Sequence, residues 1–433
     1  MDKFEPGKVI RTNFGSPITI DSYIAGGGQG DVYKVTYDGK KKALKWYKPG
    51  ALKDPNAFYD NLEKNVKKGS PDKAFLWPEA VTEKTEGSFG YVMDLKPDGY
   101  HELTNILVSS RGGGFTSFKA VVEAGIKIVS AFRNIYKIGY SYQDMNSGNF
   151  FINPQTGDVL IGDNDNVAPN GTYTGIVGTP QYMAPEIVMG KATPNTHTDE
   201  FSLAVVLFML LCASHPLEGE HWVVPCLTPE IEKKLYGSDA LFIFDPNDTA
   251  NRPVNGVHNN VLKRWDFLPQ YVKDVFVDAF SQDAIANPNK RVKYLNWLKV
   301  LVRFQSDIVR CPSCGNEIFI TDASSTKCDR CHKLYEVKHT LKLYDYSVTA
   351  AENTLIYKCQ LGVCNADEAL TPIALVEVAK NDDPNVLGLR NMTKSIVVGT
   401  TPSGKTNQVK PGEFIPLKAG ISVKVLDGKI EIQ

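Results

Sequence analysis

Two pairs of cysteines constrain the fold of this chain more than any other feature. Cys311 and Cys314 form one Cys-x-x-Cys unit, and Cys328 and Cys331 form a second one after thirteen intervening residues. Two such units at this spacing are typical of a closed site in which four thiolates bind zinc in a tetrahedron. Disulfides are the alternative, but they persist mainly in secreted proteins. Because a closed site leaves no open coordination position, we expect the zinc to have a structural role.

The first residues of the chain lack the apolar segment of a secretory signal, which favours metal over disulfides. The formal net charge is −1, and no long run of one sign is present. This balance does not favour bulk electrostatic capture of nucleic acid or of an anionic membrane surface. The longest apolar run, 203–213, is far shorter than the ~20 residues that span a bilayer. The sequence therefore predicts a soluble, cytoplasmic protein whose partners are neither nucleic acid nor membrane.

The cysteines divide the 433 residues into three predicted domains. Residues 1–305 alternate strand-like and helix-like stretches, and residues 306–338 resemble a zinc ribbon. Residues 339–433 contain short alternating apolar runs that are typical of a small antiparallel β-sandwich. One interpretation of this last domain is a docking surface. In another it resembles a forkhead-associated domain that binds phosphothreonine, for which the only hints are Arg390, Asn391 and Ser395.

A glycine-rich loop lies between two predicted strands near the start of the chain. Its sequence, AGGGQGDV over 25–32, permits close backbone approach and can turn N–H groups toward a phosphate. A simple structural hairpin is the alternative. Lys45 lies on the next predicted strand, where it can reach the phosphates of a nucleotide. Glu63 lies on the helix expected after that strand, and we expect it to pair with Lys45; a surface position for both residues is the alternative.

Three polar residues follow a long helix predicted to end at Gly139. Asn149 comes five residues after Asp144, and Asp163 follows a hairpin predicted through 154–157. Carboxylate and amide oxygens are hard ligands that suit Mg²⁺. This group could therefore hold an acceptor hydroxyl and one or two Mg²⁺ ions.

The order and spacing of these motifs resemble a eukaryotic-type, Hanks-like Ser/Thr protein kinase over roughly residues 15–303. The most specific piece is the run GTPQYMAPE at 178–186. The resemblance implies an α+β, two-lobed protein-kinase fold with a β-rich N-lobe and an α-rich C-lobe, followed by a zinc ribbon and a small all-β sandwich. It also implies an ion pair between Glu186 and Arg291.

The resemblance implies a role for each matching residue. Asp144 would be the catalytic base, and Lys45, paired with Glu63, would bind the α- and β-phosphates of ATP. Asn149 and Asp163 would bind Mg²⁺ or Mn²⁺. The residues expected to contact ATP lie in the glycine loop, on the neighbouring strand and at the hinge: Gly26, Gly27, Gly28, Gly30, Val32, Ala43, Lys45, Met93, Asp94 and Leu95.

Several residues depart from the kinase pattern. The triplet that usually reads His-Arg-Asp is Tyr-Gln-Asp at 142–144, so a phosphorylated activation loop lacks its usual arginine partner. We therefore expect an atypical, non-RD kinase that loop phosphorylation does not switch on. Asn146 stands where these kinases usually place a lysine. Asn164 replaces a phenylalanine that normally packs in an apolar spine, and Asp165 is either an extra metal ligand or part of a solvated turn.

These departures leave three interpretations open. An active Ser/Thr protein kinase is favoured because Lys45, Asp144 and Asp163 are all present. The alternative is a pseudokinase scaffold that binds nucleotide and recruits partners through its zinc ribbon and β-sandwich. A small-molecule kinase is disfavoured, because members of that class lack the run at 178–186.

The wording of 146–168, together with HPLEG at 215–219, resembles a bacterial kinase subgroup associated with tellurium-resistance and stress operons. The resemblance implies a protein substrate. It also implies two partners from the same operon, a phosphatase and a von Willebrand A-type protein.

Overall fold

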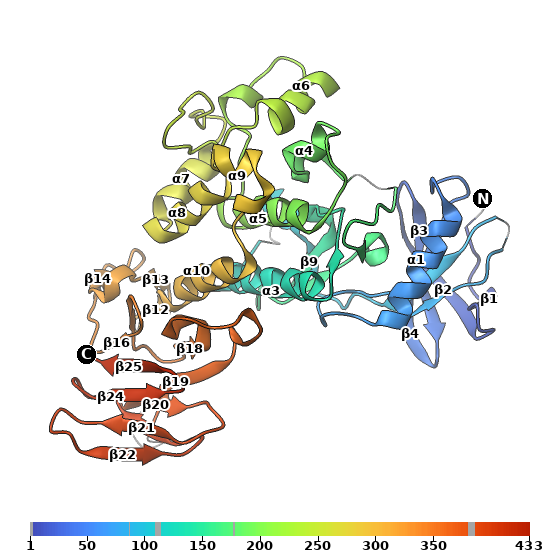
Figure 1. Cartoon of the computed structure of the whole chain (residues 1–433). Coiled ribbons are helices and arrows are strands. Elements are labelled where there is room, and N and C mark those ends of the chain that lie inside the picture. The colour runs from blue at the N-terminus through green and yellow to red at the C-terminus, as the bar shows by residue number, and fades with distance from the viewer. Residues whose placement is uncertain (1–2, 86, 109–113, 176–177, 380–385) are drawn as a thin grey trace. The chain divides into compact units, whose positions relative to one another are not determined.

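The computed structural model describes residues 3–85, 87–108, 114–175, 178–379 and 386–433. They form two compact units (Figure 1). The first unit comprises Met1–Thr116, Lys127–Asp266 and Phe276–Val292, and the second comprises Ser117–Ile126, Phe267–Val275 and Lys293–Gln433. The predicted domain boundaries at 305 and 338 stay a prediction, and the segment 293–305 groups with the later residues. None of the helices in the described ranges is long and apolar enough to cross a bilayer.

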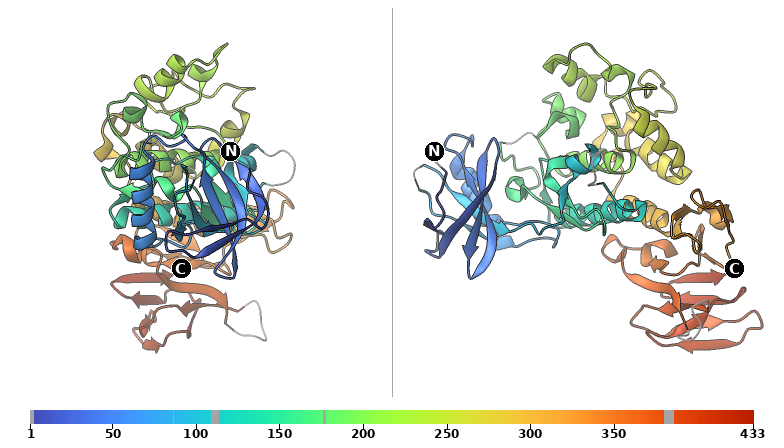
Figure 2. Two further views of the ribbon diagram at one scale, coloured as in Figure 1. Left: turned by 90° about the vertical axis from the view of Figure 1, so that its right-hand side faces the viewer. Right: turned by 180° about the vertical axis from the view of Figure 1, so that it is seen from behind.

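A six-stranded antiparallel sheet and one helix form the N-terminal part of the first unit, drawn in blue in Figure 2. The strand order is β1-β2-β3-β4-β6-β5. The strands are β1 (Val9–Arg11), β2 (Pro17–Gly26), β3 (Gly30–Tyr37), β4 (Lys40–Tyr47), β5 (Ala80–Val81) and β6 (Gly90–Asp94). Asp38 and Gly39 form the turn between β3 and β4, and their φ values of 48° and 70° suit a tight hairpin. Helix α1 (Pro55–Lys68) follows β4.

Both faces of this sheet carry apolar side chains, because successive residues of a strand point to opposite faces. On β4, Leu44 and Trp46 join a buried core on one face. Ala43 and Tyr47 join a second core, which includes residues of α1. Lys45 lies between them in the β4 sequence and shares their face. The alternation therefore carries the ammonium group of Lys45 into the interior.

The C-terminal part of the first unit is built around a buried helix, α5 (Thr196–Cys212). Its sequence is apolar nearly all round, and nearly every residue is buried. Asn195 forms a capping box with Thr198 at its start. The predicted hairpin consists of β9 (Phe150–Ile152) and β10 (Val159–Ile161), and β7 (His101–Glu102) adds a third strand.

The remaining strands and helices up to residue 286 are as follows. A two-stranded pair joins β8 (Tyr140–Ser141) and β11 (Ala168–Pro169). The other helices are α2 (Leu103–Val108), α3 (Phe118–Lys137), α4 (Pro185–Val188), α6 (Pro229–Lys233), α7 (Asn259–Phe267), α8 (Gln270–Ala279) and α9 (Gln282–Ala286). The long predicted helix is α3, and Gly139 follows it with a positive φ of 74°.

The second unit contains α10 (Tyr294–Ser306), two short hairpins and two larger sheets. The hairpins pair β12 (Ile308–Arg310) with β13 (Glu317–Phe319), and β14 (Thr326–Lys327) with β15 (Leu334–Tyr335). The larger sheets have the orders β17-β16-β25-β24-β21-β22 and β18-β19-β20-β23. One apolar core contains buried residues of both sheets, as expected for a β-sandwich.

The strands of these two sheets lie between residues 340 and 432. They are β16 (Thr340–Lys342), β17 (Ser347–Thr349), β18 (Leu355–Tyr357), β19 (Pro372–Val378), β20 (Leu387–Asn391), β21 (Val397–Thr400), β22 (Thr406–Val409), β23 (Phe414–Pro416), β24 (Ser422–Val425) and β25 (Gly428–Ile432).

The residues suggested for phosphothreonine binding have structural partners. Arg390 pairs with Glu377 at 2.7 Å. The buried amide of Asn391 donates to the carbonyl oxygens of Ser395 and Val409 at 2.9 and 3.1 Å. The ion pair joins β19 and β20, and the Asn391 amide holds the turn that follows β20, so these contacts give the phosphothreonine interpretation no support.

Candidate active site

Lys45 lies at the centre of a buried cluster of charges. Its side chain is 7% exposed, and Nζ lies 2.8 Å from Asp165 Oδ2 and 3.1 Å from Asp163 Oδ1. Tyr47, on the same face of β4, donates from Oη to Asp165 Oδ2 at 2.5 Å. Burial alone would lower the pKa of Lys45, but the charges of Asp165 and Asp163 outweigh it and raise the pKa. The cluster therefore keeps Lys45 charged.

Glu63, the predicted partner of Lys45, has a different contact. Its Oε1 accepts a hydrogen bond from Asn13 Nδ2 at 2.6 Å. Because Asp165 is fully buried, it requires a cation more strongly than the half-buried Glu63, which a neutral amide satisfies. The predicted ion pair between Lys45 and Glu63 is therefore wrong for this structure.

Residues 163–167 form a turn that is buried from Asn164 to Val167. Asp163 has left-handed backbone geometry with a φ of 48°. Asn164 is fully buried, and its amide donates to the carbonyl oxygens of Leu76 and Ile161, both at 2.8 Å. The interpretation as a solvated turn is wrong. Hydrogen bonds of Asn164 hold the turn where apolar packing of a phenylalanine was expected.

The carboxylate of Asp199, in the first turn of α5, holds the backbone just before the predicted base Asp144. It accepts hydrogen bonds from the backbone N–H groups of Tyr142 and Gln143 at 2.7 and 3.2 Å. Burial raises the pKa of Asp199 to about 7, although these two hydrogen bonds act in the opposite direction. The side chain of Asn149 donates to the carbonyl oxygen of Asp144 at 2.9 Å. These contacts fix the loop on both sides of Asp144.

The residues expected to bind Mg²⁺ fit a hard divalent cation by their chemistry. Asn149 uses its amide nitrogen for the loop, which leaves its Oδ1 for a ligand. The side chain of Asp163 is 45% exposed. Burial, and then the charge of Asp163, raise the pKa of Asp144. Carboxylates that repel one another in this way would be neutralised by a cation with oxygen ligands.

Asn146 lies beside the predicted base. Its Nδ2 is 3.5 Å from Asp144 Oδ1, and its Oδ1 accepts from the backbone N–H of Gly148 at 3.0 Å. A neutral amide at this position supplies no positive charge for a phosphate. This departure from the kinase pattern is therefore visible in the geometry.

The glycine loop connects β2 and β3 as predicted. A Cβ at Gly30 would lie 2.4 Å from the carbonyl oxygen of Trp46, so only glycine fits there. A Cβ on Gly27 or Gly28 would meet open space. Lys48 Nζ donates to the carbonyl oxygen of Gly27 at 2.7 Å. The loop thus has one glycine required by packing and two that leave room for a ligand.

The side chains expected around adenine gather in one apolar core. Ala43 and Met93 are buried in it, and Val32 and Leu95 pack against it. Phe151 and Leu160, from the β9–β10 hairpin, pack against the same core and were not predicted. Asp94 is exposed and its carboxylate pairs with Lys42 at 2.7 Å.

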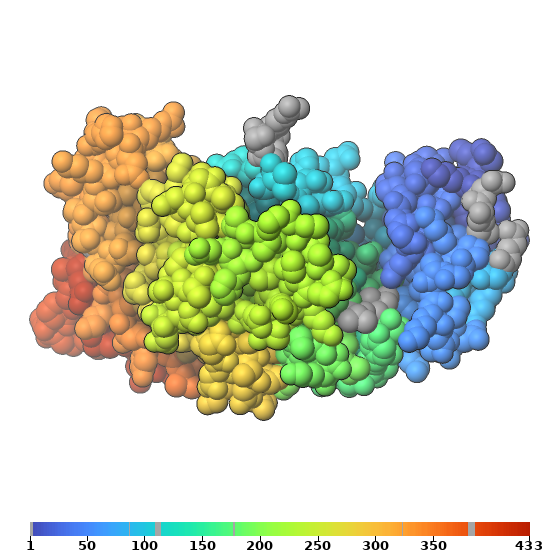
Figure 3. All heavy atoms as spheres, turned by 90° about the horizontal axis from the view of Figure 1, so that it is seen from above, coloured from blue at the N-terminus to red at the C-terminus, as the bar shows by residue number. Residues whose placement is uncertain are grey.

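A cavity of about 380 Å³ adjoins Asp144. Its lining also includes Gln29 of the glycine loop, Lys53, Thr174 and Thr179. Figure 3 shows the surface hollowed between the blue N-terminal residues and the teal and green residues of the same unit. The size is within the range of small-molecule sites.

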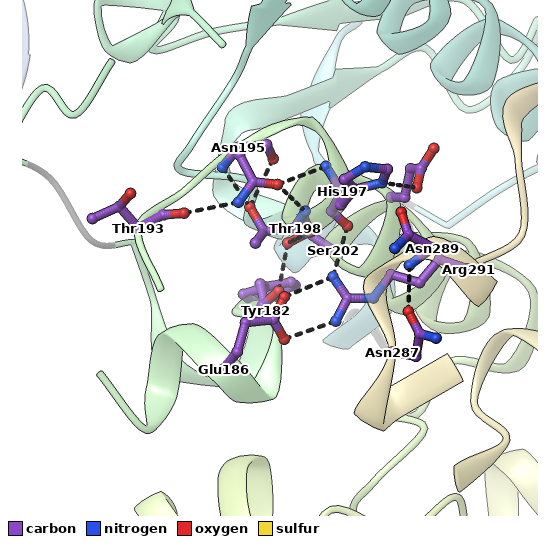
Figure 4. Close-up of polar contacts among 11 residues, drawn as sticks. Tyr182, Glu186, Thr193, Asn195, His197, Thr198, Ser202, Asn287, Asn289 and Arg291 are labelled. Carbon is purple, nitrogen blue, oxygen red and sulfur yellow. Dashed lines mark hydrogen bonds and ion pairs between the residues drawn. The ribbon is translucent and has the colours of Figure 1, made fainter. Parts of the chain in front are cut away.

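The predicted ion pair between Glu186 and Arg291 is present (Figure 4). Arg291 Nη1 and Nη2 lie 2.9 and 2.7 Å from the two oxygens of Glu186, and Nη1 also donates to the carbonyl oxygen of His197 at 2.8 Å. The Arg291 side chain is 1% exposed. Such a two-pronged geometry is among the strongest that a carboxylate can accept.

Gln143 contacts residues 172–174, which lie in the segment between Asp163 and Glu186 (the activation segment of the kinase pattern). Its Nε2 donates to the carbonyl oxygen of Thr172 at 2.7 Å, and its Oε1 accepts from Thr174 Oγ1 at 3.2 Å. A neutral amide thus occupies the place where the kinase pattern has an arginine for a phosphorylated loop.

The four cysteines of the second unit converge as predicted. Their Sγ atoms all lie within 4.8 Å of one another, with Cys311–Cys331 at 3.7 Å and Cys314–Cys328 at 3.6 Å. These separations are close to the ~3.8 Å expected for thiolates bound tetrahedrally to one zinc ion, and far from a disulfide bond of ~2.05 Å. The donor set therefore fits zinc.

Tyr47 was not among the predicted site residues, and Asp165 was expected only as a metal ligand or as part of a solvated turn. Tyr47 lies two residues after Lys45, so strand alternation could have placed it on the same face. No pattern in the sequence indicates that Asp165 is buried, because its burial depends on contacts with α1 and β4.

Comparisons with known proteins agree with this geometry. Residues 21–224 match the protein kinase domain family. A probable serine/threonine-protein kinase PknB of Corynebacterium glutamicum is 24% identical over 213 residues, which cover 46% of this chain and 32% of the relative. Maternal embryonic leucine zipper kinase of Danio rerio is 29% identical over 102 residues, covering 23% of this chain and 15% of the relative. This chain thus spans a third or less of the length of these two relatives.

A crystal structure of the PknI kinase domain of Mycobacterium tuberculosis is similar at 14% identity, with a TM-score of 0.47 over 69% of this chain and 98% of that one. Over residues 21–224, the chain is therefore similar to protein kinase domains.

Proposed function

We propose that this protein transfers the γ-phosphoryl group of ATP to Ser or Thr hydroxyls of a protein substrate. The observation that carries the proposal is the meeting of Lys45 Nζ with Asp163 Oδ1 at 3.1 Å. It brings the phosphate-binding cation next to the carboxylate expected to bind Mg²⁺, in the unit that contains Asp144. Phosphoryl transfer depends mainly on such positioning and on neutralisation of charge.

Each residue has a defined task in this proposal. Asp144 accepts a hydrogen bond from the acceptor hydroxyl and takes its proton as the oxygen attacks the γ-phosphorus, while the bond from that phosphorus to the bridging oxygen breaks and ADP leaves. Lys45 holds the α- and β-phosphates. Asn149 Oδ1 and Asp163 would hold Mg²⁺ or Mn²⁺, which would neutralise the charge of the phosphates. The glycine loop would cover the phosphates with backbone N–H groups.

The proposal extends to the rest of the chain. We infer that the cysteine site binds zinc as a structural ion, which the sulfur separations support. The neutral contacts of Gln143 support a kinase of the non-RD type. A cytoplasmic location rests on the sequence pattern alone. Membership of the tellurium-resistance subgroup, and partnership with a phosphatase and a von Willebrand A-type protein, rest on the sequence resemblance alone.

A pseudokinase scaffold is the second candidate. Asn146 favours it, because this neutral amide stands beside Asp144 in place of the usual lysine. In that case the protein would bind nucleotide and recruit partners without transferring phosphate.

The test is autophosphorylation with labelled γ-ATP and Mg²⁺ or Mn²⁺, read by intact mass. Wild type is compared with Asp144→Ala and with Asp158→Asn, an Asp in the hairpin whose side chain is 47% exposed. Phosphate on wild type and Asp158→Asn, but not on Asp144→Ala, is the expected result. Nucleotide-induced stabilisation without any mass gain, repeated with a generic acceptor such as casein, would favour the scaffold. A mass gain the size of AMP would overturn phosphoryl transfer.

A further inference from the structure

The kinase pattern expects a carboxylate on α1 to position Lys45, yet α1 contributes no such contact in the structure. We propose that Asp165 is the positioning residue that holds Lys45 for nucleotide binding. This inference rests on the proposed function, because it concerns the same phosphate-binding lysine.

The contacts of Asp165 fit this role. Its Oδ2 lies 2.8 Å from Lys45 Nζ and accepts from Tyr47 Oη at 2.5 Å. The Asp165 side chain is fully buried, and that of Lys45 is 7% exposed. A buried carboxylate of this kind is costly unless it is paired and hydrogen-bonded. Lys45 and Tyr47 therefore fix Asp165, and Asp165 in turn fixes Lys45.

Asp163 has a different environment. It also contacts Lys45, but at the longer distance of 3.1 Å, and its side chain is 45% exposed. An exposed carboxylate can turn toward a cation at small cost. Asp165 would then remain as the partner that keeps Lys45 in place while Asp163 binds metal.

Helix α1 holds this arrangement through amides instead of an acid. Asn61 Nδ2 contacts the carbonyl oxygens of Asp165 and Val167 at 3.4 and 2.9 Å, and Asn65 Nδ2 donates to that of Val167 at 2.7 Å. The helix thus hydrogen-bonds to the backbone of the turn that contains Asp165. Its Glu63 is left to accept from Asn13. The carboxylate that pairs with Lys45 therefore lies in the turn at Asp165 and not on α1.

A role for Asp165 as an additional metal ligand is less compatible with these contacts. Its Oδ2 is shared by Lys45 and Tyr47, and its Oδ1 is buried with no hydrogen-bond partner among the residues described. A metal would have to enter this closed space beside the ammonium group. The positioning role needs no such rearrangement.

The experiment measures binding of mant-ATP, a fluorescent ATP analogue, to the full chain with and without Mg²⁺. The variants are Asp165→Asn, Tyr47→Phe and Glu63→Gln, with Asp158→Asn as the matched control. We expect Asp165→Asn to weaken binding about 10-fold, and Tyr47→Phe to weaken it ~3-fold, since it removes one hydrogen bond. Glu63→Gln should have a much smaller effect than Asp165→Asn.

A second comparison separates positioning from mere folding. In a Lys45→Met background, Asp165→Asn should weaken mant-ATP binding no further, because Asp165 acts through Lys45. A structural role would weaken binding in both backgrounds and would overturn the proposal. If Asp165→Asn fails to fold, Tyr47→Phe in the two backgrounds provides the same test.

Two other outcomes would also overturn it. One is a loss in Glu63→Gln equal to that in Asp165→Asn, which would return the ion pair to α1. The other is an effect of Asp165→Asn seen only with Mg²⁺, which would make Asp165 a metal ligand. Binding is measured without turnover, so an inactive wild type would refute the proposed function and leave this test readable.

Discussion

The Glu186–Arg291 pair and the Lys45 cluster are both buried charges of the first unit, but they were predicted with different success. Arg291 has the partner that the motif indicates, at 2.7 Å. Lys45 has two carboxylates from one turn, and the expected acid on α1 contacts another residue. The first pair joins two motifs that each match the kinase pattern. The second involves the turn at 164–165, which departs from that pattern, as does position 146.

The difference shows that the partner of a buried charged side chain depends on all the groups around it and on their burial. Arg291 has one carboxylate and one carbonyl oxygen within reach of Nη1 and Nη2. Lys45 has two carboxylates within reach, Asp165 at 2.8 Å and Asp163 at 3.1 Å. Asp165 makes the shorter contact and has the least access to water.

The largest expected effect on stability comes from the four-cysteine site, whose thiolates would bind a zinc ion. We expect about one zinc ion per chain by elemental analysis, and its loss in Cys311→Ser and Cys328→Ser. Loss of a structural zinc removes on the order of 10 kcal/mol from a small metal-dependent fold, so the thermal transition of the second unit should fall or vanish. Cys226→Ser, at an exposed cysteine, is the control. Absence of zinc from wild type would contradict this expectation.

The Glu186–Arg291 pair provides the next largest effect. Arg291→Ala would leave Glu186 and the carbonyl oxygen of His197 without their partner, which costs roughly 3–5 kcal/mol at a buried site. Arg291→Lys keeps the charge but loses the two-pronged geometry, so it should lie in between. Urea unfolding measures both, with Arg11→Lys at an exposed arginine as the control. Equal free energies of unfolding for wild type and Arg291→Ala would show that this buried pair, predicted correctly, contributes no stability.

The Lys45 cluster should show coupling between its members. We expect Lys45→Met and Asp165→Asn each to destabilise the first unit, because the first leaves buried Asp165 without a cation and the second leaves Lys45 with only the partly exposed Asp163. The double variant should regain part of the loss, with a coupling energy of about 2 kcal/mol in a double-mutant cycle. Strictly additive effects in urea unfolding would show that the two charges do not depend on one another.

A smaller effect is expected at Asp307 in the second unit. Tyr271 Oη donates to Asp307 Oδ2 at 2.5 Å, and Arg303 lies over the Tyr271 ring at 3.9 Å. Burial raises the pKa of Asp307 to about 7, whereas an unfolded aspartate titrates near ~3.9. The folded state therefore keeps its proton over this range, and stability falls as pH rises from about 4 to 7, by at most ~1.4 kcal/mol per pH unit.

Asp307→Asn should remove this slope, because a neutral amide can still accept from Tyr271. The variant should match wild type at acidic pH and exceed it above neutral pH, as measured by urea unfolding of the second unit. Asp345→Asn, at an exposed aspartate, should keep the slope of wild type. A slope that persists in Asp307→Asn would assign it to another group.

Much of the fold could be predicted from local pattern. The apolar sequence of α5, the hairpin at 154–157 and the cysteine spacing each depend on a few neighbouring residues. Glu186 and Arg291 could be paired because both match a motif. The partner of Lys45 could not be predicted from local pattern, since Asp163, Asp165 and Glu63 are equally acidic in the sequence. Only the packing of α1 against the turn decides which of them is buried.

The Gln143 contacts with Thr172 and Thr174 have a consequence for how the protein responds to its surroundings. An arginine–phosphate contact weakens as ionic strength rises, because salt screens exposed charges. An amide clamp between neutral groups has no such dependence. The activation segment should therefore be cleaved by a protease at the same rate in dilute and concentrated salt. The contacts of Gln143 with Thr172 and Thr174 should then persist when the ionic strength changes. They should also persist in the presence of a phosphatase, because they involve no phosphate.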